Sequence, residues 1–242
     1  MAPLHKEAIL HQQIKDQIIK QIKSGEYPVQ SQLPTEAEFC DTYRVSRTTI
    51  RAALQQLSQE GYVYRRQGRG TFVAEPKIKT SLSQTITSFN EQLTSQGKHP
   101  QIKVLSLQLV PADEQIATIL KTEANAPVYK LVRLRFGDNK PLQYETAFLP
   151  WSLAPGLTET QCQQSLYSAL RTDFQVHIAR TEEQLQLATM EGDVCEHMQC
   201  EEHTPCIYLE TSAFLKNGTI VEYSQTYFHG ERASFQIERV YE

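Results

Sequence analysis

The stretch LPTEAEFCDTYRVSRTTIRAALQQLSQEGYVYRRQGRGTFV, residues Leu33–Val73, decides the fold expected for the first part of the chain. Thr35 and Glu38 have the spacing of a capping box, which predicts a short helix that starts after Thr35. A tight turn follows, and Ser46 is placed to cap a second helix that runs to about Glu60. Two short helices joined by a turn form a helix-turn-helix.

Residues on either side of these helices extend the motif to a small domain. After the second helix, the strand candidates Tyr62–Arg66 and Thr71–Ala74 are joined by the glycine-containing tip Gln67–Gly70, a pattern typical of a wing. Upstream, isoleucines recur at every fourth position and predict a further helix over residues 7–24. We therefore predict a winged helix-turn-helix domain over residues 1–75.

The second helix of the motif carries side chains suited to DNA. Arg47, Thr48 and Arg51 lie within about one turn of its start and face away from its apolar stripe. An arginine can bind guanine O6 and N7 together, which contributes about 1–3 kcal/mol of discrimination. Hydroxyls suit phosphate, and an arginine at a glycine-flanked wing tip can enter the minor groove. The predicted DNA-binding residues are Ser46, Arg47, Thr48, Thr49, Arg51, Arg66, Gly68, Arg69 and Gly70.

Taken singly, each of these arginines is compatible with an ordinary solvated helix face, and only their order along the motif favours DNA. The charge distribution points the same way. Residues 1–80 hold 12 basic and 8 acidic side chains, whereas the remainder holds 12 basic and 20 acidic ones. Because the first part is basic and the remainder is acidic, we expect only the first part to bind a polyanion, although chance clustering is an alternative.

The composition excludes several classes of protein. Hydrophobic residues make up 40% and charged residues 21% of the 242 residues, as in ordinary globular proteins. No apolar run is long enough to predict a membrane span, and the first residues lack the apolar segment of a signal peptide. Five cysteines, an odd number, fit free thiols in a reducing compartment. We expect a cytoplasmic protein.

A polar segment over residues 76–88 predicts a linker, and from Phe89 the pattern changes to mixed helices and strands over residues 89–242. The fold class is therefore α+β, a winged helix-turn-helix joined by a linker to a mixed α/β domain. The predicted elements of this second domain are strands at Val104–Val110, Val128–Phe136, Leu142–Leu149, Ile207–Leu215, Ile220–Phe228 and Ser234–Val240, and helices at Asp113–Lys121, Ser165–Arg171 and Glu191–Gln199.

Polar residues of the second domain predict a pocket for a small anion. Arg133 and Arg135 are two apart on one strand, so they share a face, and Glu145 lies on the expected partner strand. Ser165 opens a helix whose N-terminus favours an anion, and Tyr167 follows it closely. Glu222 and Tyr227 on a later strand suit ligand hydroxyls. In the alternative interpretation, the two arginines simply pair with Glu145 and Glu210 across the sheet.

Two other interpretations concern metal binding and catalysis. The cysteines and histidines at 195–206 lack the spacings of zinc sites and are better explained as small apolar residues. No Gly-x-Ser-x-Gly motif is present, so no catalytic residue is predicted. We expect neither a metal nor a cofactor, and no enzymatic activity. An architectural DNA binder without preference for a palindrome is a further alternative.

The Leu33–Val73 stretch resembles the winged-helix domain of GntR-superfamily regulators, whose pattern is roughly LPSEREL…YxVSRxTVRxAL..L..EGxLxRxxGxGTFV. The resemblance implies DNA contacts at Ser46, Arg47, Thr48, Arg51 and the Gly68–Gly70 wing. One position departs from the pattern. Many members carry an arginine that contacts DNA where this chain has Ala37, which implies either a lost contact or a different operator.

Residues 80–242 resemble the UTRA effector domain of the HutC subfamily, whose fold is like that of chorismate lyase. The motifs are LTSQGKHPQIKVLSL, VYKLVRLRF…KPLQYETAFLP, SLYSAL and VEYSQTYFHGERASFQI. In sugar-phosphate-responsive relatives, the arginine strand, the serine at the helix start, the Ser88-Phe89 segment and the late Glu and Tyr line the pocket. Asn90 stands where threonine is frequent, and His229 and Ala233 also depart from the family pattern. The predicted effector-binding residues are Ser88, Phe89, Asn90, Arg133, Arg135, Glu145, Ser165, Tyr167, Glu222 and Tyr227.

These features predict a DNA-binding transcription regulator that responds to a metabolite. One small domain makes few base contacts, so we expect a homodimer on a palindromic site in double-stranded DNA. The resemblance implies dimerisation through the second domain and a repressor released by a sugar phosphate or amino sugar phosphate. The alternatives are a non-phosphorylated carboxylate as effector, activation in place of release, and a chorismate-lyase-like enzyme fused to a DNA-binding domain.

Overall fold

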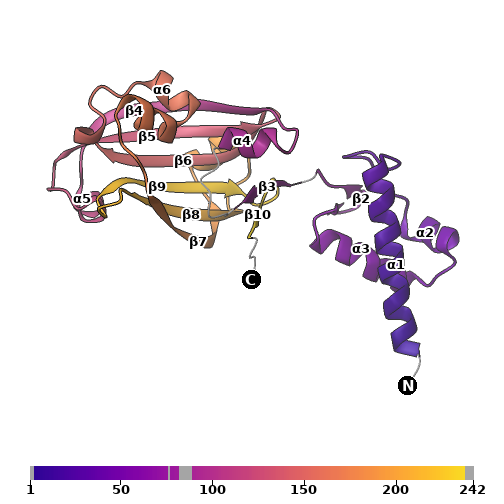
Figure 1. Ribbon diagram of the computed structural model, residues 1–242. Coiled ribbons are helices and arrows are strands. Elements are labelled where there is room, and N and C mark those ends of the chain that lie inside the picture. Colours follow the sequence, from indigo (N-terminus) through magenta and orange to yellow (C-terminus); the bar gives the residue numbers. More distant parts are fainter. Residues whose placement is uncertain (1–2, 76, 82–88, 238–242) are drawn as a thin grey trace, which may run out of the picture. The chain divides into compact units, whose positions relative to one another are not determined.

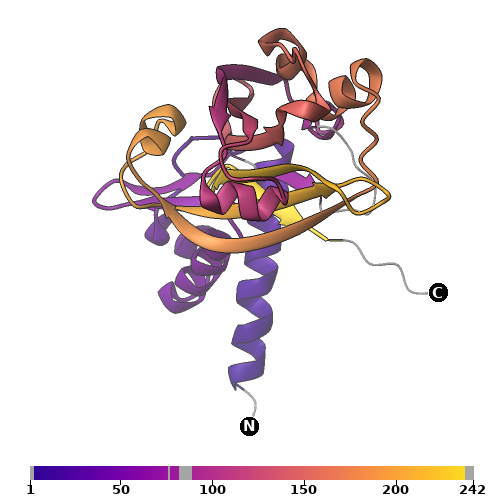
Figure 2. The same cartoon turned by 90° about the vertical axis from the view of Figure 1, so that its left-hand side faces the viewer.

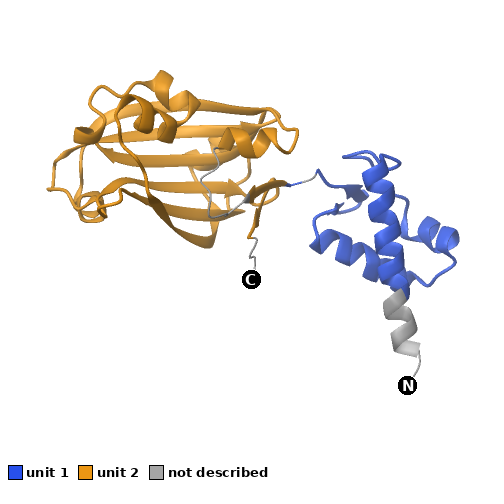
Figure 3. Cartoon of the chain, viewed as in Figure 1, with its two compact units in different colours: residues 1–77 blue, residues 78–242 orange. Residues whose placement is uncertain are grey.

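The computed structural model describes residues 3–75, 77–81 and 89–237. The chain divides into two compact units, Met1–Lys77 and Ile78–Glu242, shown in different colours in Figure 3. Among the described helices, none is long and apolar enough to cross a membrane. Each unit has its own hydrophobic core and is described by itself.

The first unit is a winged helix-turn-helix, as predicted. Thr35 and Glu38 form the expected capping box, and Arg44 adopts a left-handed conformation (φ 53°) that turns the chain between the two helices of the motif. Ser46 caps the second helix through Thr49 N–H. The elements are α1 (Pro3–Ser24), α2 (Glu36–Tyr43), α3 (Arg47–Gln59), β1 (Val63–Arg66) and β2 (Gly70–Val73).

The core of the first unit holds α3 in place from one side only. Ile14 and Ile18 of α1 pack with Phe39 of α2 and with the inward stripe of α3, which includes Ile50 and Leu54. Each buried side chain of this size contributes about 1.5–3 kcal/mol relative to an exposed one. The opposite side of α3 is therefore left for another partner.

The second unit is built on an antiparallel sheet with the strand order β4-β5-β6-β9-β8-β7 (Figure 1). Its strands twist relative to one another (Figure 2), as sheets of L-residues do. The strands are β4 (Pro100–Pro111), β5 (Pro127–Gly137), β6 (Lys140–Pro150), β7 (Arg180–Met190), β8 (Thr204–Phe214) and β9 (Ile220–His229).

Short helices cover both faces of this sheet. One face packs against α6, α7 and α4, and the other packs against α5 and α8. These helices are α4 (Phe89–Thr94), α5 (Glu114–Leu120), α6 (Glu159–Gln164), α7 (Leu166–Asp173) and α8 (Asp193–Met198), and a single turn of 3-10 helix covers Trp151–Leu153. The predicted helices at Asp113–Lys121, Ser165–Arg171 and Glu191–Gln199 correspond to α5, α7 and α8.

Part of the predicted linker is a strand of the second unit. β3 (Ile78–Ser81) pairs in parallel with β10 (Ala233–Gln236), and Ile78 is buried beside Phe89. A single apolar residue in a polar segment was too weak a pattern to predict this strand. Residues 76 and 82–88 of the predicted linker lie outside the described residues.

β7 was not predicted either. Its sequence RTEEQLQLATM is polar, and the strand lies at the edge of the sheet, with most side chains exposed on both faces. An edge strand of this kind lacks the clear alternation of buried and exposed residues that identifies half-buried strands.

The five cysteines are free thiols, and Cys162, Cys195 and Cys206 are buried.

Candidate functional site

The outward side of α3 brings together three of the predicted DNA-binding side chains. Arg47 and Thr48 at the start of the helix are exposed, and the Arg51 side chain is 67% exposed. Ser46 Oγ accepts the backbone N–H of Thr49 at 3.3 Å and thereby caps the helix. These residues form a polar surface at the N-terminal end of α3, the end that enters the major groove in helix-turn-helix proteins.

Thr49 does not belong to this surface. Its side chain is buried, and its Oγ1 lies 2.9 Å from Ser46 Oγ. Thr49, Ala53 and Leu57 are spaced by four residues, so Thr49 belongs to the inward stripe of α3. The structure therefore gives Thr49 a structural role in the helix cap and not the predicted place on the DNA-facing surface.

Arg51 is oriented by a residue of α2. Its Nε donates to Glu36 Oε2 at 2.8 Å, and this pair joins the two helices of the motif. This bond to Nε constrains the direction in which the guanidinium lies. Ala37, which follows Glu36, is exposed on α2. Sequence reasoning missed Glu36, since the pair is distant in sequence.

In the wing, Arg66 is oriented by a different kind of contact. The Arg66 guanidinium lies over the rings of Tyr64 and Phe72, 5.4 Å from each centroid. Such cation–π contacts hold the side chain along the wing. Gly68 (φ 71°) and Gly70 (φ 111°) have conformations that favour glycine, and Arg69 between them is exposed. A hollow of about 350 Å³ lies between Gln32–Glu36 and the wing.

Three residues of the second predicted group, Arg133, Arg135 and Glu145, lie on one face of the sheet. Arg133 of β5 donates from Nε to Glu145 Oε2 of β6 at 2.7 Å, and from Nη1 to the carbonyl oxygen of Cys162 in α6 at 3.3 Å. Arg135 donates from Nη2 to both oxygens of Glu145 at 2.9 Å. The alternative of pairing across the sheet therefore holds for Glu145. Glu210 does not take part, because it accepts from Tyr223 on the opposite face.

One carboxylate thus faces two guanidiniums in a site where Arg133 is 3% exposed. Burial alone would raise the pKa of Glu145, but Arg133 and Arg135 outweigh burial and hold it below its usual value. Burial also lowers the pKa of Arg135, against the attraction of Glu145. Uncompensated positive charge is costly away from water, so this arrangement favours an anionic ligand.

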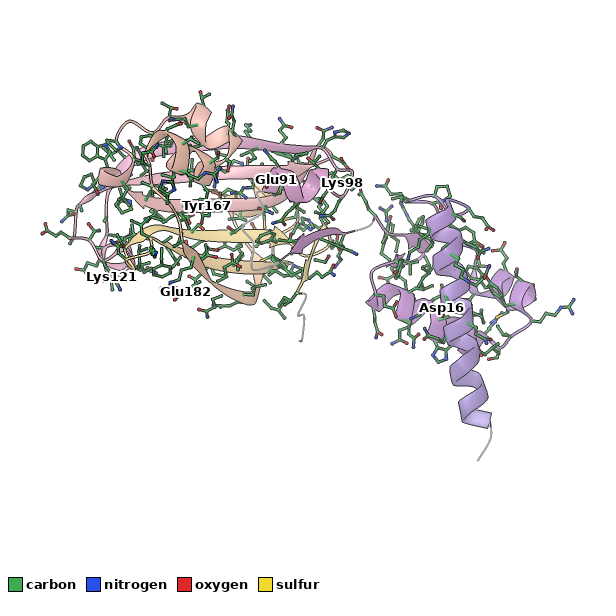
Figure 4. All side chains as sticks on the ribbon, in the orientation of Figure 1. Asp16, Glu91, Lys98, Lys121, Tyr167 and Glu182 are labelled. Atoms are coloured by element: carbon green, nitrogen blue, oxygen red, sulfur yellow. The ribbon has the colours of Figure 1, made fainter. Side chains whose placement is uncertain are left out.

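Glu222 of β9 shares this face with Glu145. Tyr167 of α7, labelled in Figure 4, donates its hydroxyl to Glu222 Oε2 at 2.7 Å. Burial, with help from the neighbouring charge of Glu145, raises the pKa of Glu222 to about 7. Glu222 therefore adds only part of a negative charge near neutral pH. Ser165 caps α7, and its Oγ accepts the backbone N–H of Ser168 at 3.3 Å.

The start of α4 adds Phe89 to this site. The Arg135 guanidinium lies over the Phe89 ring, 5.4 Å from its centroid. Asn90 Oδ1 and Arg135 Nε are buried, and neither atom has a hydrogen-bond partner among the residues that the structure describes. Buried polar atoms of this kind are rare without a partner. Ser88 lies outside the described residues.

Tyr227 is not brought together with the other predicted residues. Alternate residues of a strand point to opposite faces, and Tyr227 is an odd number of positions from Glu222. It packs beside Met190 and Cys206 on the α8 face, with its ring 4.9 Å from that of Tyr208. The same alternation places further buried polar residues on the Glu222 face, namely Gln143, Thr211, Ser224 and Thr226.

Comparisons with known proteins support the two-part organisation. The model of bacterial regulatory proteins of the gntR family matches residues 10–73, and the model of the UTRA domain matches residues 95–234. The HTH-type transcriptional repressor NagR of Bacillus subtilis (strain 168) is 31% identical over 226 residues, which cover 93% of each chain.

A second relative and a solved structure agree with this match. The mannosyl-D-glycerate transport/metabolism system repressor MngR of Escherichia coli (strain K12) is 28% identical, over 94% of this chain and 95% of the relative. The crystal structure of PhnF from Mycobacterium smegmatis superposes with a TM-score of 0.69 at 26% identity, over 96% of this chain and 100% of that chain. The likeness thus extends over both units.

Proposed function

Because this chain belongs to the GntR family of bacterial regulators and carries a UTRA domain, we propose that it is a repressor released from its operator by a small anionic effector. The observation that carries the proposal is the Arg133/Arg135 pair, buried against the single fully charged carboxylate of Glu145. The relatives are named as regulators, which supports a binding role for the second domain and not a catalytic one.

The chemistry of the site favours a phosphorylated sugar or amino sugar. An arginine guanidinium can bind phosphate with two parallel hydrogen bonds. The two guanidiniums carry more positive charge than Glu145 neutralises, and a phosphate would balance the remainder. Glu222 and Tyr167 offer an acceptor and a hydroxyl for sugar hydroxyl or amino groups, while Asn90 Oδ1 and Arg135 Nε supply a further acceptor and donor. Relatives named for mannosyl-D-glycerate and fructoselysine systems support a sugar derivative as the ligand.

We assign DNA binding to residues 1–75, with α3 in the major groove and the wing in the adjacent minor groove. Arg47, Thr48 and Arg51 then contact bases, and Ser46 at the helix start contacts a phosphate. The wing contributes Arg66, Gly68, Arg69 and Gly70. The exposed position of Ala37 on α2 leaves this operator without one arginine contact that is frequent in the family.

We propose a palindromic operator bound by a two-fold dimer, and we place the dimer contact on the second domain. β7 is an edge strand whose Leu187 and Leu185 side chains are 92% and 40% exposed. A long edge strand with exposed leucines favours association with another chain. In this proposal a second copy covers β7. Replacement of Leu187 by Asp is expected to yield monomers in light scattering, whereas Gln186→Asp on the other face of β7 serves as the matched control.

Effector binding and operator binding are linked by thermodynamics. An effector that prefers the state with weak operator affinity must weaken operator binding by the same factor, typically about 5–150-fold. Isothermal titration calorimetry of the full chain against glucose 6-phosphate, glucosamine 6-phosphate and N-acetylglucosamine 6-phosphate tests the ligand class. Mannosylglycerate serves as the carboxylate arm, and unphosphorylated glucosamine serves as the arm without an anionic group. The proposal predicts binding of a phosphorylated sugar, and binding confined to the unphosphorylated arms would overturn it.

A further inference from the structure

Within the described residues, a side chain from outside the wing is hydrogen-bonded to the wing tip. The two wing strands span only four residues each, and the turn at the tip contains the backbone hydrogen bond from Arg69 N–H to Arg66 O at 3.0 Å. A two-stranded hairpin is at best marginally stable alone. The direction of the tip therefore depends on contacts with the body of the domain.

Gln32, in the segment before α2, supplies such a contact. Its backbone lies alongside β2, bridged to Phe72, and the flanking bonds Leu33 N–H to Thr71 O and Val73 N–H to Ser31 O measure 2.8 and 2.9 Å. The segment thus lies against β2 through an isolated bridge and its flanking hydrogen bonds. From this position, Gln32 Nε2 donates to the carbonyl oxygen of Arg69 at 2.9 Å.

Gly70 is shaped to receive this amide. A Cβ atom at Gly70 would lie 2.7 Å from Gln32 Nε2, closer than real side chains approach, and the φ of +111° disfavours other residues. The backbone conformation is what favours glycine here, and a Cβ would in addition displace the Gln32 amide from its present position. Arg66 differs from Arg69, because its guanidinium is held by Tyr64 and Phe72 within the wing.

We propose that Gln32 is a positioning residue for DNA binding, which braces the wing tip so that the Arg69 side chain is directed into the minor groove. The inference rests on the proposed placement of the wing. Gln32 itself makes no base contact in this account. Its donor fixes the carbonyl of Arg69, and the direction of that peptide determines where the Arg69 side chain emerges.

The test replaces the donor without changing the length of the side chain. Gln32→Met is expected to weaken operator binding about 3–10-fold, the equivalent of one lost hydrogen bond. Hydroxyl-radical footprints should lose protection in the minor groove beside each half-site, while protection of major-groove guanines from methylation is retained. Gln59→Met, at the exposed end of α3, is the control. An unchanged melting temperature of Gln32→Met excludes a general loss of stability.

A double-mutant cycle with Arg69→Ala separates this inference from the proposed wing contact. If Gln32 acts through Arg69, the double variant binds the operator no more weakly than Arg69→Ala alone. Wild-type affinity of Arg69→Ala would refute the placement of the wing in the minor groove. Weakened binding by Arg69→Ala, with either no effect of Gln32→Met or independent, multiplying effects, would refute the brace and leave the wing contact intact.

Discussion

The two units use arginine in opposite settings. In the first unit, Arg51 is 67% exposed and pairs with a Glu36 side chain that is 31% exposed. In the second, Arg133 is 3% exposed and shares the 8% exposed Glu145 with Arg135. An exposed cation loses little when its partner is exchanged for a phosphate of DNA. A buried pair is costly to break, so its ligand must fit around it and not replace it.

The largest effect on stability is expected when the carboxylate of Glu145 is removed. Glu145→Ala leaves two buried guanidiniums without their counter-charge and should lower the free energy of unfolding of the second unit by about 3–5 kcal/mol. Urea denaturation followed by circular dichroism measures the change. If Glu145→Ala lowers the free energy of unfolding by less than about 1 kcal/mol, water screens the arginines at Glu145 as strongly as it screens a surface ion pair.

The next largest effect concerns Glu222, whose pKa burial raises to about 7. An unfolded glutamate titrates near pH 4.3, so the stability held by the protonated folded form is present below that pH and is lost as the pH rises towards about 7. Glu222→Gln mimics the protonated form. Relative to wild type, it should gain on the order of 2–3 kcal/mol between pH 4.5 and 7.5, as measured by denaturation at each pH. A difference independent of pH would contradict the buried, protonated carboxyl.

Substitutions on α3 should affect binding and not stability. Arg47→Ala and Arg51→Ala are each expected to reduce specific operator binding by about 1–3 kcal/mol, while the free energy of unfolding changes by less than about 0.5 kcal/mol. Fluorescence anisotropy with labelled operator measures the affinity, and Gln55→Ala, exposed further along α3, is the control. Wild-type affinity in both arginine variants would exclude α3 as the reading helix.

The smallest effect is expected for the surface pair itself. Glu36→Gln should change the free energy of unfolding by less than about 1 kcal/mol, because the Arg51 side chain is exposed and the Glu36 side chain is partly exposed. Its operator affinity should nevertheless fall by a few fold, since Arg51 loses its orientation. A loss of stability as large as that of Glu145→Ala would erase the contrast between the two units.

Local patterns predicted the first unit well. The capping box at Thr35, the cap at Ser46 and the glycines of the wing each act within a few residues, and the structure confirms the elements they mark. Thr49 was assigned to the outer face because its hydroxyl suits phosphate, although its spacing to Ala53 places it inside. Gln32 and Glu36 were missed because their partners in the wing and in α3 are distant in sequence.

The second unit was harder to predict, because its site is assembled from distant strands. The pairing of Arg133 with Glu145 followed from a hairpin, which is a local feature. The placement of Glu222 beside them depends on β9 pairing with β6, which no short pattern reveals. Tyr227 was grouped with Glu222 by proximity in sequence, whereas strand alternation turns it to the other face. β3 and β7 were missed because their sequences are polar.

The central claim is that an anion bound at Arg133 and Arg135 controls the affinity with which α3 and the wing bind operator DNA. The most direct measurement is operator affinity by fluorescence anisotropy, with and without a saturating sugar phosphate, in wild type and in Arg135→Gln. We expect the effector to weaken binding by wild type about 5–150-fold and to leave Arg135→Gln, which binds operator normally, unaffected. Equal operator affinity of wild type with and without every phosphorylated sugar that binds the second unit would contradict the claim.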